Sequence, residues 1–138
     1  MYKEKIEKEG TVYAYIIRAN DKIEGSKFVT DPNDPLQLGM LSWPKGHIEL
    51  PHKHRKMDKV IKEVHEVLGV VKGIIEVDFY DEDKNKINTT SLSVGDTMLL
   101  AEGIHRIRII EDAKGIKVKQ GPYRGIEQDK EIVNIEEW

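Results

Sequence analysis

The sequence contains no cysteine among its 138 residues. This absence excludes a disulfide framework, a zinc site built from thiolates and a cysteine nucleophile. The sequence also lacks an apolar run close to the ~20 residues that cross a membrane as a helix. Residues Met1 to Gly10 are rich in charge and have no apolar core of the kind found in a secretory signal. We therefore expect a cytoplasmic protein with no membrane partner.

An excess of positive charge is also missing. Lys and Arg together number 22 and Asp and Glu together number 25, which gives a formal net charge of -3 at pH 7. This balance provides no basic surface for nucleic acid, and the aromatic residues do not sit among basic ones as in proteins that bind single strands. We expect no nucleic-acid partner. The length fits a single domain, 1–138, with a core of its own.

What is present is a series of short strand signals. β-branched and aromatic residues group into segments that end at Gly, Pro, Asn or Asp. They predict strands over residues 12–18, 36–43, 66–72, 74–80, 97–101, 105–109 and 116–119. Closely spaced strands with turns between them indicate an all-β sandwich or barrel. Met57, Val60, Ile61 and Val64 have helical spacing, but we favour a loop leading into a strand near Val60 over a short helix.

Two histidines, His52 and His54, extend an apolar stripe. Alternate side chains of a strand share a face, so Ile48, Leu50 and both histidines would point the same way. Imidazole is the commonest side-chain metal ligand near neutral pH. The stretch therefore predicts a metal site inside a barrel. His47 would lie on the opposite face, at the surface.

His105 is a third candidate ligand. On a strand it would share a face with Ile107 and Ile109, while Arg106 and Arg108 would take the other face. Because arginine is the costlier residue to bury, we expect the histidine face to be the inner one. The competing interpretation is a core histidine that bonds to the backbone.

A carboxylate, Glu66, begins the apolar run 67–71. A carboxylate there is costly to bury unless it is paired or bound to an ion. The run is apolar on both faces, so alternation leaves open whether Glu66 or His65 points inward.

Basic residues flank the histidine pair. They are Lys53, Arg55, Lys56 and Lys59. Such a run is usually a solvated loop, and the second interpretation is a surface that attracts an anionic substrate.

These residues together resemble the cupin family. Gly46 to His54 matches the Gly-x5-His-x-His opening of the first cupin motif, and Glu66 to Gly73 matches its Glu-x6-Gly close. Gly95 to His105 resembles the second motif. The resemblance extends over about residues 36–120, which would form the barrel core between an N-terminal strand and a C-terminal tail ending in Trp138. It implies a jelly-roll, or double-stranded β-helix, barrel.

The resemblance also implies a ligand set. The implied ligands are His52, His54, Glu66 and His105. Three imidazoles and one carboxylate suit a divalent transition metal such as Mn, Fe, Ni, Co or Zn. The insertion from Arg55 to His65 is longer than in the family motif, which leaves Glu63 and His65 as alternatives to Glu66. Family members are usually dimers, so we expect a homodimer.

Three functions are consistent with this resemblance. In the first, the metal acts on a small anionic or sugar-derived substrate, as in cupins of bacterial polysaccharide and nucleotide-sugar pathways, with Glu102, Lys119 and Tyr123 as accessory groups. The second is a barrel that binds a small sugar or acid without chemistry. The third is a metal-free sugar isomerase or epimerase with a histidine as general base. Whether the protein is an enzyme stays open at this point.

Overall fold

The computed structural model of the chain describes residues 4–135. Trp138, the expected end of the C-terminal tail, lies outside the described residues. The elements within the described range are β1 (Glu4–Lys8), β2 (Thr11–Ile17), β3 (Gly25–Phe28), β4 (Gly39–Ser42), β5 (Glu66–Tyr80), β6 (Lys86–Leu92), β7 (Thr97–Leu100), β8 (Ile104–Lys119) and the short helix α1 (Ile126–Asp129). None of the helices in residues 4–135 has the length and apolar character to cross a membrane.

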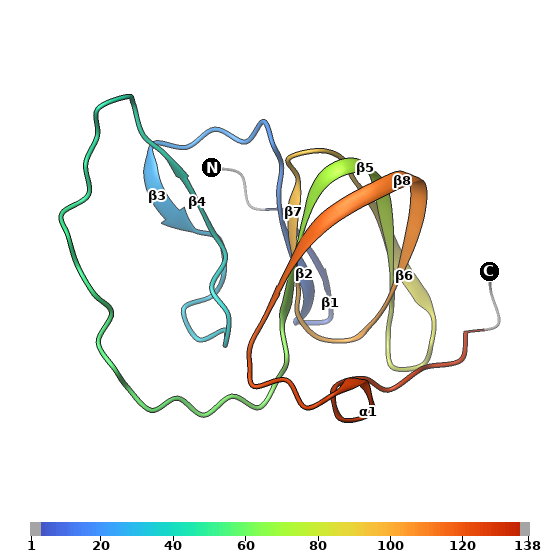
Figure 1. Cartoon of the computed structure of the whole chain (residues 1–138). Coiled ribbons are helices and arrows are strands. Elements are labelled where there is room, and N and C mark those ends of the chain that lie inside the picture. The colour runs from blue at the N-terminus through green and yellow to red at the C-terminus, as the bar shows by residue number, and fades with distance from the viewer. Residues whose placement is uncertain (1–3, 136–138) are drawn as a thin grey trace.

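The main sheet is built around β5. Its strand order is β1-β2-β7-β5-β6, and β8 pairs with β5. On one edge β5 pairs with β7 through Glu66–Gly69 and with β6 through Ile75–Tyr80, and on the other edge it pairs with β8 from end to end. Every pair is antiparallel. Figure 1 shows β5 and β8 arching together, so that the sheet curls into a half-barrel.

The β5–β8 ladder changes register where the two strands bend. The register shifts lie between Val70 and Ile75. Gly73 lies in this stretch with a φ of 80°, a conformation that other residues rarely adopt. A Cβ atom on Gly73 would collide with the carbonyl oxygen of Asp112 on β8. Gly73 therefore allows a close crossing of two backbones, and the irregular ladder adds local twist and bending.

Two apolar cores lie on the two faces of the main sheet. The face inside the curl, called here the concave face, carries Leu68, Ile75, Val77, Phe79, Met98, Leu100 and their neighbours. On the outer face, Tyr15, Ile17 and Leu99 pack against Val29 and Leu38. Val29 and Leu38 belong to the connection between β3 and β4, so this connection covers the outer face of the sheet.

A buried carboxylate ties β5 to β8 on the outer face. Asp78 is 0% exposed. Arg108 donates to both of its carboxylate oxygens, at 2.7 and 3.0 Å, and Arg106 donates to Oδ2 at 3.0 Å. Thr89 of β6 donates its hydroxyl at 2.7 Å. These hydrogen bonds, and the one from Arg108 most of all, hold the pKa of Asp78 far below its usual range. Burial acts in the opposite direction and raises this pKa.

The structure agrees with an all-β chain. It adds β1, β3 and β6, which the sequence analysis did not predict as strands, and it differs from the predicted strands in three further places. Residues 66–72 and 74–80 form one strand, β5, because Gly73 bends the strand without ending it. Residues 105–109 and 116–119 are likewise joined in β8. Residues 43–65 contain neither the strand expected near Val60 nor a helix. This segment swings away from the half-barrel in a wide arc (Figure 1).

We predict that Asp78→Asn lowers the free energy of unfolding by about 2–4 kcal/mol at pH 7, because two guanidinium groups lose their buried counter-ion. Since the folded-state pKa of Asp78 is lowered, its contribution is present above the unfolded value of 3.8 and is lost as the pH falls below it. Urea unfolding at pH 7 and at pH 3 measures both effects. Asp83→Asn, at an exposed carboxylate of the β5–β6 turn, is the control. Equal losses for the two variants would contradict the prediction.

Candidate functional site

Two of the predicted ligands, Glu66 and His105, share the concave face. Their positions on the ladder are far apart, because Glu66 pairs with Lys119 while His105 pairs with Phe79 at the other end of β5. The charge of Glu66 nevertheless acts on the pKa of His105, which places the two side chains within electrostatic reach. The curl of β5 and β8 accounts for this approach.

The register of β5 decides between Glu66 and His65. Glu66 pairs with Leu100, and Leu68 pairs with Met98, so Glu66 lies on the concave face. His65 precedes it on the opposite face and is 3% exposed. Glu63, the other alternative, lies in the exposed segment before β5.

His105 lies on the concave face, because its partner Phe79 belongs to that core. The expectation that the histidine face is the more buried one is wrong, because His105 is exposed while Arg106 and Arg108 are half-buried, and His105 is not a core histidine either. Arg106 and Arg108 are not fully solvated on the other face but are held by Asp78. The concave face is open at this strand, so His105 keeps an exposed side chain while Ile109 is 58% exposed.

The environment of His105 favours its neutral form. Although the His105 side chain is partly open to solvent, desolvation by the protein atoms around it lowers its pKa most. The charge of Glu66 raises this pKa, and the charges of Lys130 and Lys117 lower it. The net pKa lies below the usual value of 6.5. A neutral imidazole near pH 7 is the form that binds a metal or accepts a proton.

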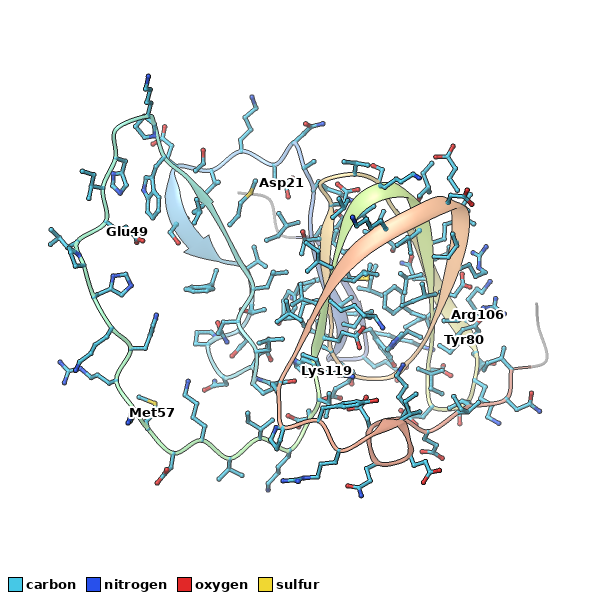
Figure 2. The ribbon with its side chains drawn as sticks, viewed as in Figure 1. Asp21, Glu49, Met57, Tyr80, Arg106 and Lys119 are labelled. Atoms are coloured by element: carbon cyan, nitrogen blue, oxygen red, sulfur yellow. The ribbon has the colours of Figure 1, made fainter. Side chains whose placement is uncertain are left out.

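Two lysines at the C-terminal end of β8, Lys117 and Lys119, lie near Glu66. Lys117 Nζ lies 3.3 Å from Glu66 Oε1. Lys119 Nζ lies 2.8 Å from Asp129 Oδ2 of α1 and 5.1 Å from the ring centre of Tyr123. The bond to Asp129 raises the pKa of Lys119. Figure 2 labels Lys119 where the end of β8 meets the start of β5.

Of the predicted accessory groups, Lys119 pairs with Glu66 on the ladder, and Tyr123 lies beside Lys119. The third, Glu102, lines a cavity on the outer face. Lys117 was missed by the sequence analysis. A signal was available, because Lys117 and Lys119 alternate with Val118. The contribution of Asp129 had no comparable signal, because it depends on how the chain turns back after β8.

His52 and His54 do not join Glu66 and His105. Their rings lie 5.6 Å apart in the exposed segment 43–65. Ile48 and Leu50 are 81% and 83% exposed, so the stripe predicted to face a core faces solvent. Figure 2 shows Glu49 and Met57, which belong to this segment, far from the strands of the half-barrel. Within residues 4–135, no three His or acidic side chains are arranged to hold a metal ion.

The other residues of this segment are also exposed. His47 stacks on Trp43 with ring centres 4.4 Å apart, in keeping with its predicted place at the surface. The basic residues Lys53, Arg55, Lys56 and Lys59 are all exposed. They therefore lie in a solvated loop, and in this conformation they do not line the face that carries Glu66 and His105.

No family model matches the chain, and no curated protein and no solved structure matches it significantly.

We predict that His105 of the metal-free protein titrates below pH 6.5, and that Glu66→Gln lowers its pKa further. Removing the carboxylate charge removes the interaction that favours the protonated imidazole. NMR titration of the histidine ring protons in the presence of a chelator measures the shift, and His105→Asn identifies the resonance. Glu127→Gln, at an exposed position of α1, is the control. A His105 pKa unchanged by Glu66→Gln would show that the two groups do not interact.

Proposed function

We propose that the chain is a cupin-like barrel protein that binds a divalent transition metal through His52, His54, Glu66 and His105. The observation that carries the proposal is that the register places Glu66 and His105 on the same open concave face, where the charge of Glu66 acts on His105. In the conformation described here, the four side chains do not form one site. The proposal therefore requires segment 43–65 to close onto the half-barrel.

The free edge of β8 supports such a closure. Among the described residues β8 pairs only with β5, so its second edge is unpaired from Ile104 to Lys119. An unpaired edge next to an exposed apolar stripe is a ready template for another strand. An antiparallel pairing would set His52 opposite His105, Leu50 opposite Ile107 and Ile48 opposite Ile109.

Charge and burial favour this register. It would place Glu49 opposite Arg108 on the outer side of the strand, where opposite charges stabilise a pair. Pro51, which has no N–H to donate, would lie on an edge strand, where proline is tolerated. Burial of Ile48 and Leu50, each more than four-fifths exposed, would contribute about 1.5–3 kcal/mol per side chain.

The metal, when bound, would supply a Lewis acid. His105 contributes a neutral imidazole, and Glu66 contributes a carboxylate held by Lys117. Lys119 and Tyr123 offer a cation and an aromatic ring at the edge of the same face. These groups suit a small anionic or sugar-derived substrate.

One observation favours a second candidate function. His105 is neutral at neutral pH and near Glu66 without any contribution from His52 or His54. A histidine in this form can act as a general base. A metal-free isomerase or epimerase therefore uses the concave face as it stands, and metal content separates the two candidates. A barrel that binds the same ligand without turnover is distinguished by the absence of product.

We predict that protein prepared without chelators holds about one equivalent of a transition metal by elemental analysis. His105→Ala and the double variant His52→Ala, His54→Ala are expected to lose it, because imidazole ligands supply most of the binding free energy. His47→Ala removes an exposed histidine of the same segment and is expected to keep the metal. Stoichiometric metal in the double variant would refute the proposed ligand set.

We also propose a homodimer, because the β8 edge beyond Ile109 stays free when segment 43–65 closes, and this edge and the exposed side chains of Ile110 and Ile116 are surfaces that a second copy can cover. Light scattering at micromolar concentration is expected to give twice the chain mass of 15.9 kDa. A mass of one chain would contradict this prediction.

A further inference from the structure

A cavity of about 260 Å³ lies on the outer face of the main sheet, the face opposite to that of Glu66 and His105. Its polar lining comes from four parts of the chain. Tyr15 belongs to β2, Asp31 and Asp34 to the β3–β4 connection, His65 precedes β5, and Glu102 follows β7. Among residues 4–135, no lysine or arginine lines the cavity. Within this part of the chain, the fold therefore gathers three carboxylates here without a neutralising cation.

His65 gives an independent indication of a missing partner. It lines the cavity, is 3% exposed, and its Nδ1 atom has no hydrogen-bond partner among the described residues. Its backbone N–H donates to Gln120 Oε1 at 2.9 Å, which fixes the position of the residue. Buried polar atoms without partners are costly and rare, so they point to a bound group.

The remaining groups of the cavity are mainly hydrogen-bond acceptors. Asp34 accepts from the backbone N–H of Asp31 at 3.2 Å, which orients its carboxylate. Burial raises the pKa of Tyr15. The hydrogen bond between the Tyr15 hydroxyl and the Asp34 side chain raises this pKa further, so the phenol stays protonated. Glu102 is exposed and forms no hydrogen bond or ion pair with any described residue. Its carboxylate is free to meet a ligand.

We propose that this cavity binds a small organic cation that carries a primary ammonium group. An ammonium has three donors and no acceptor, which complements the carboxylates and the unpartnered imidazole nitrogen. The volume is below that of pockets for drug-sized ligands, so the ligand is a short chain of a few carbon atoms. A bare metal ion fits less well, because residues 4–135 contain no group of three His or acidic side chains placed for one.

The test is a backbone-amide NMR titration of the full chain with putrescine, in the presence of a chelator so that metal binding cannot contribute. We expect saturable shifts centred on Tyr15, His65 and Glu102, with an apparent affinity that falls as salt is added. Glu102→Gln is expected to weaken binding about tenfold, since it removes one charge-assisted hydrogen bond. Glu102 is exposed, so this variant should fold as the parent does, which circular dichroism verifies.

Three comparisons decide the outcome. Glu127→Gln, at an exposed acidic residue of α1, is expected to bind putrescine like the parent. The neutral isostere 1,4-butanediol is expected to cause no saturable shifts. The proposal is overturned if the diol binds as well as the diamine, if Glu102→Gln and Glu127→Gln behave alike, or if Ca²⁺, titrated separately without the chelator, saturates the cavity and putrescine does not. Because the cavity and Glu66 lie on opposite faces of the sheet, the result is independent of the metal proposal.

Discussion

The continuous pairing of β5 with β8 is the constraint on which the rest of the structure depends. The two strands stay hydrogen-bonded from Glu66 to Tyr80, through the register shifts beside Gly73. Without the bend, Glu66 and His105 would remain at opposite ends of a long ladder. With it, the ladder wraps around the core of Val77, Phe79 and Met98, and its two ends come within electrostatic reach. The site is therefore a consequence of backbone curvature.

Both faces of the curled sheet use charge, in different ways. On the outer face at the β5–β8 pair, Asp78 is buried and saturated by Arg106, Arg108 and Thr89, so this cluster holds the strands together and offers nothing to a ligand. At the edge of the concave face, the charged groups are partly exposed and only partly matched, as with Glu66 and Lys117. The cluster around Asp78 is therefore structural, whereas the charged groups around Glu66 remain available to a ligand.

Alternation along the strands predicted part of the site. It placed His105 on one face of its strand together with Ile107 and Ile109, because alternate side chains of a strand share a face. The pairing of His105 with Phe79 identifies this face as the concave one. The same reasoning did not decide between His65 and Glu66, because the residues after them are apolar on both faces and the choice depends on the pairing with β7. It also predicted a strand for residues 48–54. A strand requires a hydrogen-bonding neighbour, and a pattern of side chains cannot supply one.

The sequence by itself determined an all-β chain and the shared face of His105, Ile107 and Ile109, because these depend on local backbone preference and side-chain alternation. Only the tertiary structure decided that Gly73 bends β5 instead of ending it, that Glu66 lies on the concave face, and that His65 lines an acidic cavity on the other side. These features depend on which strands pair and in what register, and such long-range contacts leave no trace in the local order of residues.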